Sequence, residues 1–174
     1  LNSRMAEEAT NLTRALKGDN KTQGGWGEQV LGRILDASGL TEGRDYHSQF
    51  SYVDEQKNRK QPDCVIFLPE NKAIIVDSKV SLVAYDRYIN AETEVLREVA
   101  LKDHVRSLKT HIDGLSAKSY EALPGMRNLD FVLIFIPIES AFTDALRFDD
   151  ALYLYALDKN IVIAAPSTLL ATCR

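Results

Sequence analysis

The chain has 174 residues, enough for one domain with a sizeable core, and its 45% hydrophobic and 26% charged residues are ordinary for a globular protein. The formal net charge of −4 excludes a surface coated in positive charge, although a local phosphate-binding patch remains compatible with it. No apolar run approaches the ~20 residues needed to span a membrane, so we expect no membrane contact from this segment. The two cysteines, Cys64 and Cys173, lack the spacing of a zinc site, and we expect two free thiols, with one disulfide as the alternative.

Two helices are predicted at the start of the chain. A 4-3-4 spacing of apolar residues predicts a helix over residues 1–17, which would fit the end of a coiled coil. A second apolar stripe predicts a helix from about Gly25 to Ala37, ended by Gly39. We therefore expect a helical stub over residues 1–20 and one main domain over residues 21–174, truncated at its C-terminus.

Three strands are predicted next. Polar and apolar residues alternate over residues 45–53, which predicts a single half-buried strand, and the wholly polar stretch 54–61 predicts a loop. Two continuous apolar runs follow, at 64–68 and 73–76, and a turn-forming segment separates them. Continuous apolar runs are typical of strands that are covered on both faces.

A long helix is predicted from about Ala91 to Leu123, where Pro124 and Gly125 break it. His104 and His111 share one face of this helix, and we expect that face to be solvated and not to hold a metal. The apolar stripe of the helix has 4-3-4-3 spacing and consists of Leu101, Val105, Leu108, Ile112 and Leu115.

The last part of the chain predicts a strand, two short helices, a strand and a further helix. Their ranges are 130–138, 140–147, 149–158, 161–165 and from Pro166 onward. The fold class is therefore α/β, with a mixed sheet of about five strands flanked by helices.

The candidate chemistry lies on the two apolar strands in the middle of the chain. Asp63 stands directly before the first run, and Asp77 and Lys79 stand at the end of the second. If the hairpin folds about Glu70, Asp63 lies opposite Asp77, and Lys79 shares the face of Asp77 because the two are two residues apart. An even-numbered loop would place Asp63 opposite Ser78, on the wrong face. The site therefore requires an odd-length loop or a bulge.

Two carboxylates and a lysine at one strand end are suited to metal-assisted phosphate chemistry. Mg²⁺ prefers oxygen ligands and keeps several waters, and the ion acidifies a bound water. Lys79 could hold or help to deprotonate that water. The alternative is structural: Asp63 caps a turn, and Asp77 and Lys79 form an ion pair at the strand end.

The pattern Asp63…Asp77-Ser78-Lys79 resembles the PD-(D/E)xK nuclease signature. Longer segments, in the same order and covering about residues 24–170, resemble one branch of it, the RmuC family of DNA recombination proteins. These segments are Gly25–Glu28 through Ile34-Leu35, Gly39-Leu40, Tyr46–Gln49, Pro62-Asp63, Val76–Leu82 with Ala84-Tyr85, and Phe135–Ala141. The resemblance implies a restriction-endonuclease-like core, a role in DNA recombination, and often an N-terminal membrane anchor with a coiled coil.

Residue by residue, the resemblance implies Asp63 and Asp77 as metal ligands and Lys79 as the catalytic lysine. Glu28 matches the glutamate on the first core helix, as a ligand for Mg²⁺ or Mn²⁺, with an interaction with the helix dipole as the alternative. Gln49 and Glu139 are candidates for lining the cleft; ordinary surface polarity and a place beside a helix cap are their alternatives.

Four basic residues could contact the phosphates of DNA, with an ordinary solvated surface as the alternative. They are Lys57, Arg59, Lys60 and Arg87. We expect a metal-dependent deoxyribonuclease located in the cytoplasm, whose parent chain self-associates through an upstream coiled coil and is held at the inner membrane. The alternative function is a non-catalytic nucleic-acid-binding or scaffold module on the same fold.

Overall fold

A computed structural model describes residues 20–78, 81–117 and 127–173. The helix predicted over residues 1–17 and the candidate lysine, Lys79, lie outside this part of the chain. In the described ranges, no helix has the length and apolar character needed to cross a membrane.

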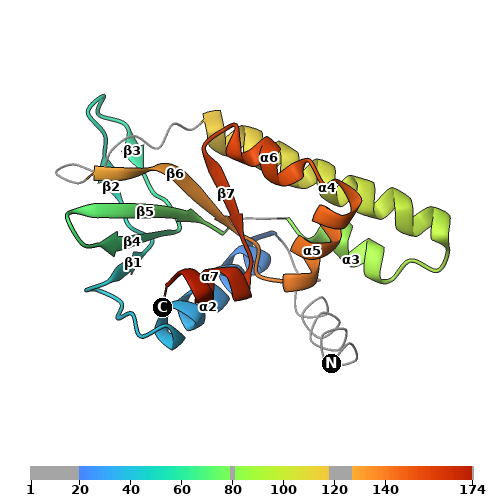
Figure 1. Ribbon diagram of the computed structural model, residues 1–174, viewed down its shortest axis with the longest axis horizontal. Helices are drawn as coiled ribbons and strands as arrows, with labels where there is room; N and C mark the ends of the chain where they lie inside the picture. The colour runs from blue at the N-terminus through green and yellow to red at the C-terminus, as the bar shows by residue number, and fades with distance from the viewer. Residues whose placement is uncertain (1–19, 79–80, 118–126, 174) are drawn as a thin grey trace.

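A five-stranded mixed sheet forms the centre of the molecule, as predicted (Figure 1). The order is β1-β4-β5-β6-β7; β1, β4 and β5 pair antiparallel, whereas β5, β6 and β7 pair parallel. The strands are β1 (Tyr46–Ser48), β4 (Cys64–Leu68), β5 (Lys72–Asp77), β6 (Arg127–Phe135) and β7 (Ile161–Ala164). The chain changes from antiparallel to parallel pairing at β5, so the end of β5 lies at the same sheet edge as the ends of β6 and β7.

Helices cover both faces of this sheet (Figure 1). Helices α2 (Asn20–Ala37) and α7 (Pro166–Thr172) pack on one face, where Leu31, Leu35 and Leu169 share a buried cluster with β4, β5 and β6. A second buried hydrophobic cluster, on the opposite face, joins the sheet to α3 (Val83–Ile89), α4 (Glu94–Ala117), α5 (Glu139–Phe148) and α6 (Leu152–Leu157). The α2–sheet–α4 layering buries each helix along its apolar stripe.

For most elements the predicted boundaries agree with the observed ones to within a few residues, and α2 begins earlier than predicted. The long helix is α4, whose predicted end falls beyond the described residues. Helix α3 was not predicted; it has only seven residues, of which Ala84 and Tyr85 are buried, too few to show a periodic stripe.

The prediction of one strand over residues 45–53 is wrong. Gln49 has a φ of 54°, a left-handed conformation that ends β1 and turns the chain. Tyr46 consequently packs in the cluster beneath α2, whereas Tyr52 packs in a third cluster with Val65 and Ile75. Alternation alone could not reveal this break, since both aromatic residues are buried.

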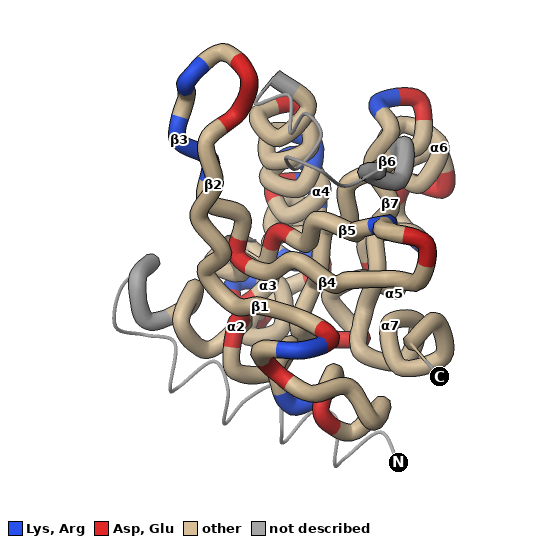
Figure 2. The backbone as a smooth tube through the Cα atoms, turned by 90° about the vertical axis from the view of Figure 1, so that its left-hand side faces the viewer, with Lys and Arg blue, Asp and Glu red and all other residues tan. Residues whose placement is uncertain are grey.

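The polar stretch predicted as a loop forms a small hairpin instead. Strand β2 (Tyr52–Val53) pairs antiparallel with β3 (Arg59–Lys60) in a separate two-stranded sheet. The carboxylate of Asp54 stabilises the turn by accepting a hydrogen bond of 2.7 Å from the backbone N–H of Asn58. The hairpin projects from the body of the protein (Figure 2).

The expectation that His104 lies on a solvated face is also wrong. Its side chain is completely buried, and Nε2 lies 2.9 Å from the carbonyl oxygen of Ala141 on α5. Its ring also packs on that of Tyr85, with 5.1 Å between centroids. His104 therefore joins α4 to both α3 and α5.

Candidate functional site

The register of β4 against β5 determines where the two candidate aspartates lie. Cys64 pairs with Val76 and Leu68 with Lys72, which leaves a three-residue turn, 69–71, between the strands. The same register continued by one position places Asp63 opposite Asp77, and both residues are buried, with 2% and 3% of their surface exposed. The odd-length loop that the sequence required is thus confirmed.

Asp63 is held in place by the residue that follows Asp77. Its Oδ2 accepts a hydrogen bond of 2.8 Å from the backbone N–H of Ser78 and one of 3.3 Å from the Ser78 hydroxyl. The carbonyl oxygen of Asp63 accepts a further bond of 2.8 Å from the backbone N–H of Gln49. The two bonds from Ser78 direct the Asp63 carboxylate toward the end of β5, and the bond from Gln49 holds its backbone.

Asp77 is in contact with a residue that the sequence analysis assigned to solvent. Nε2 of His111 lies 3.0 Å from Oδ1 of Asp77, and only 23% of the His111 side chain is exposed. The expectation of a solvated face therefore holds only in part for His111, whose ring also contacts Asp77. His111 follows His104 by seven residues, and both lie directly beside the apolar stripe of α4, which was the available signal for an inward direction.

Helix α2 approaches the same strand end from the opposite face. A Cβ added at Gly27 would lie 3.2 Å from the carbonyl oxygen of Ser78 and 3.8 Å from Cγ of Pro137, so only glycine fits here without displacement. The next residue along α2 is the candidate ligand Glu28. Burial raises the pKa of the Cys64 thiol to about 12, and the negative charges of Glu42, Asp63 and Glu28 contribute to that shift.

The arrangement stops short of a complete metal-ligand set. Within the described residues, no group of three or more His, Cys, Asp or Glu side chains is placed to hold a metal ion. Glu28, Asp63 and Asp77 therefore do not form a ready triad, and the two opposed aspartates are the part of the predicted set that lies together.

The two candidates for lining the cleft have local partners. Oε1 of Gln49 accepts a hydrogen bond of 3.2 Å from Gln61, and the residue is exposed. The carboxylate of Glu139 accepts two bonds from Ser167, 3.0 Å from the backbone N–H and 2.6 Å from the hydroxyl. Glu139, the first residue of α5, thus also stabilises the first turn of α7 by accepting these two bonds.

The basic residues fall in two places. Lys57, Arg59 and Lys60 lie on the β2–β3 hairpin, where Figure 2 shows the positions of basic residues in blue along the backbone. Nε of Arg59 donates to the Ser51 hydroxyl at 2.9 Å. Arg87 lies on α3 and forms an ion pair of 3.5 Å with Asp103 on α4.

The two cysteines are free thiols, as expected. Cys64 is buried on β4, and Cys173 packs against the same cluster from the end of α7. Burial raises the pKa of both thiols, which keeps them protonated and weakly nucleophilic near neutral pH.

Comparison with known proteins gives one consistent result. The model of the RmuC family matches residues 1–174. The DNA recombination protein RmuC of Escherichia coli K12 is 52% identical over 174 residues, which are 100% of this chain and 37% of that protein. The RmuC homologs of Pseudomonas aeruginosa and Vibrio cholerae are 55% and 51% identical over all of this chain, and 38% and 34% of their lengths are covered. The chain thus spans little more than a third of these relatives, and no solved structure matches it.

Proposed function

Because this chain belongs to the RmuC family, we propose that it acts on DNA in recombination and hydrolyses phosphodiester bonds with the help of a divalent metal ion. Its relatives carry the name DNA recombination protein, which supports DNA as the substrate. The observation that carries the hydrolytic part is the burial of Asp63 and Asp77 opposite one another at one strand end. Two carboxylates at one strand end supply the kind of oxygen ligands that Mg²⁺ uses in proteins.

The metal ion would be Mg²⁺ or Mn²⁺. Mg²⁺ is commonly bound by one or two carboxylates and retains several waters, so Asp63 and Asp77 would supply its protein ligands. The bound ion would acidify a water molecule and offset the negative charge of the phosphate. Glu28 would interact through one of the retained waters, because it is not gathered with the two aspartates.

The surrounding residues would orient these ligands. Ser78 donates to Asp63, and the imidazole of His111 contacts Asp77, so both carboxylates keep their direction when substrate arrives. Lys79, two residues after Asp77, would lie beside the attacking water and stabilise the charge that develops on the phosphate.

The proposal includes the restriction-endonuclease-like fold of PD-(D/E)xK nucleases. The order of a helix, an antiparallel hairpin, a crossover helix and a parallel strand supports it, since the signature residues fall on the hairpin. The basic hairpin residues Lys57, Arg59 and Lys60 would contact phosphates outside the cleft. Location in the cytoplasm and self-association through an upstream coiled coil stay predictions.

A non-catalytic DNA-binding or scaffold module is the second candidate. It is favoured by the fact that both aspartates already have hydrogen-bond partners in the protein, Ser78 and His111. In such a module Asp63 and Asp77 would stabilise the junction of β4, β5 and α4 and would not need a metal.

Cleavage assays decide between these functions. Linear, single-stranded and branched DNA would be incubated with the purified chain in Mg²⁺, Mn²⁺ or EDTA. We expect metal-dependent cleavage that falls by about 100-fold or more in Asp77→Asn and Lys79→Ala. The exposed Asp150→Asn is the matched control and should retain activity. If the wild type binds DNA but cuts no substrate in either metal, the hydrolytic function is wrong and the binding module stands.

A further inference from the structure

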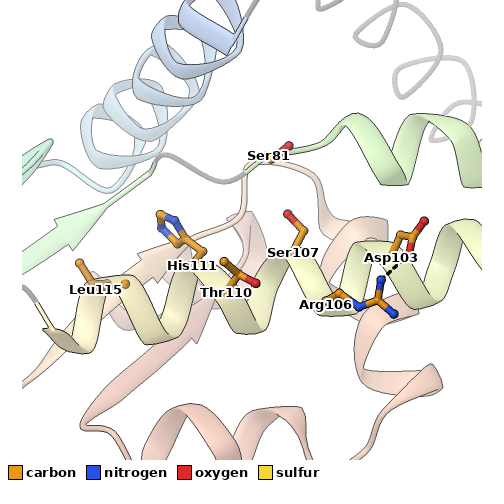
Figure 3. A pocket seen from close by; sticks show the side chains of 8 residues that line it. Ser81, Asp103, Arg106, Ser107, Thr110, His111 and Leu115 are labelled. Atoms are coloured by element: carbon orange, nitrogen blue, oxygen red, sulfur yellow. Dashed lines mark hydrogen bonds and ion pairs between the residues drawn. The ribbon is translucent and has the colours of Figure 1, made fainter.

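A groove lined mainly by polar residues runs along α4 beside the candidate site. It has a volume of about 620 Å³ and lies between α4 and Ser81 (Figure 3). All but two of its lining residues are polar or charged: Ser81, Asp103, Arg106, Ser107, Thr110 and His111. A groove lined in this way offers hydroxyl, guanidinium and imidazole groups that can donate hydrogen bonds.

The groove follows one face of the helix. Its residues on α4 recur every three or four positions from Asp103 to Gly114, so they lie in a row. At 1.5 Å per residue this row is about 16 Å long. Gly114 leaves the far end open, because a Cβ added there would meet nothing within 4 Å.

Two arginines meet at the end of the groove distant from β5: Arg106, which lines the groove, and Arg87 on α3, which lies beside the lining residue Asp103. Arg87 and Arg106 both contact the single carboxylate of Asp103, at 3.5 and 3.2 Å. Their side chains are 57% and 69% exposed, so N–H groups remain accessible from solvent. Two guanidinium groups around one carboxylate leave one net positive charge, and guanidinium is the group best matched to phosphate oxygens.

The other part of the groove adjoins the carboxylates. His111 lines the groove and also lies 3.0 Å from Asp77, so one imidazole connects the groove to the candidate metal ligand. An anionic chain in the groove would therefore lie beside Asp77. One DNA strand advances 3.4 Å per nucleotide along the duplex axis, so about 16 Å of groove would pass about four or five phosphates.

We propose that this groove binds the sugar-phosphate backbone of one DNA strand and leads it to the two aspartates. Arg87 and Arg106 contact phosphates, while Ser81, Ser107 and Thr110 donate hydroxyl hydrogen bonds to neighbouring phosphate oxygens. The inference rests on the proposed function for the identity of the anion, and it adds the path by which the strand reaches the site.

The test is DNA binding in EDTA, where metal-dependent cleavage cannot occur. Fluorescence anisotropy would be measured over a range of salt concentrations with a labelled 20-nucleotide strand and the corresponding duplex. The variants are Arg87→Gln, Arg106→Gln, their combination, and Gly114→Leu, which fills the open end of the groove. Lys102→Gln is the matched control, since Lys102 is an exposed cation on the same helix that does not line the groove.

We expect each arginine substitution to reduce the slope of log K against log salt by about one, and the double variant by about two. Gly114→Leu should weaken binding without lowering the melting temperature, and Lys102→Gln should keep the wild-type slope. If the arginine variants behave like Lys102→Gln and Gly114→Leu binds like the wild type, the groove is not the strand site. Failure of the wild type to bind DNA also overturns the inference.

The cleavage assay separates this inference from the proposed function. A wild type that cuts DNA, together with groove variants that bind and cut normally, would overturn the groove and leave the hydrolytic function intact. Groove variants that lose binding, together with a wild type that never cuts, would support the groove and overturn hydrolysis.

Discussion

His111 on α4 and Asp77 at the end of β5 are in direct contact, with 3.0 Å between Nε2 and Oδ1. Helix α4 is the connection between the parallel strands β5 and β6, so the contact ties the crossover helix to the strand that precedes it. The direction of a carboxylate at the candidate site is therefore controlled by packing between the sheet and α4.

Substitution of His111 should weaken metal-dependent cleavage without removing it. His111→Ala takes away the partner that orients Asp77, and loss of such a partner typically costs 10–100-fold in metal affinity or activity. His111→Gln retains a hydrogen-bonding group and should recover part of the loss. The measurement is the cleavage rate as a function of Mg²⁺ concentration, with melting temperatures recorded for both variants. Wild-type rates of His111→Ala at every Mg²⁺ concentration would show that the contact has no role in the reaction.

Two glycines of α2 should respond differently to alanine. A methyl group added at Gly32 would have open space around it, so Gly32→Ala should stabilise the protein by about 1 kcal/mol through helix propensity. At Gly27 the same methyl group would lie 3.2 Å from the carbonyl oxygen of Ser78. This oxygen belongs to the backbone at a buried strand end, which cannot move easily to relieve the contact. Gly27→Ala should therefore be less stable than Gly32→Ala by about 1 kcal/mol.

Chemical denaturation of the two variants measures this difference. If both alanine substitutions raise the free energy of unfolding by the same amount, α2 is not in close contact with the end of β5. If Gly27→Ala also lowers DNA cleavage while Gly32→Ala does not, the approach of α2 matters for the geometry around Asp63 and Asp77.

Stability should fall as the pH drops below 6.5, and His104 should contribute to that fall. Burial lowers the pKa of His104, and the weaker opposing effects of the Ala141 carbonyl and Asp144 do not reverse the shift. The unfolded chain therefore takes up a proton near pH 6.5 that the folded protein does not, so stability is present above that pH and is lost below it. One such proton changes the free energy of unfolding by at most about 1.4 kcal/mol per pH unit.

The variant His104→Gln tests this effect because it keeps a donor for the Ala141 carbonyl. Unfolding free energies measured between pH 5 and 7.5 should depend less steeply on pH in the variant. Nδ1 of His104 has no hydrogen-bond partner among the described residues, so the variant should not be greatly destabilised at pH 7.5. Identical pH slopes for variant and wild type would contradict the assignment of a neutral, buried imidazole.

The two thiols should react slowly and in a fixed order. With a pKa of about 12, only ~10⁻⁴ of Cys64 is thiolate at pH 8, and the residue is 1% exposed. Cys173 is partly exposed and should react first with a disulfide reagent. The order is checked by timed thiol release in Cys64→Ala and Cys173→Ser. Rapid modification of Cys64 in the folded protein would mean that the β4 strand opens readily.

The hairpin was predictable because its signals are local. The apolar runs, the turn chemistry of residues 69–71 and the position of Asp63 and Asp77 at equal distances from Glu70 are all contained in one short segment. Pairing of two strands within such a segment depends little on contacts with distant residues, so the strands and their register can both be predicted from the sequence.

The features that sequence reasoning missed depend on distant partners. The inward direction of His111 requires Asp77, which precedes it by 34 residues, and that of His104 requires Ala141, which follows it by 37. General exposure trends favour solvent for histidine, and only the tertiary contact reverses that expectation. The break at Gln49 was missed for a related reason: a left-handed residue is rare, and the aromatic residues on both sides of it are buried on different faces.

The three-residue turn after β4 has a consequence for how this chain can change in evolution. The turn lies about 17 Å from the aspartates, at 3.4 Å per strand residue, and no chemistry takes place there. Its length nevertheless determines which residue faces Asp77, because one inserted residue would exchange the two faces of β4 relative to β5. Insertions or deletions of two residues in this exposed turn should therefore be tolerated, whereas those of one residue should be selected against. Surface turns elsewhere in the chain should accept either.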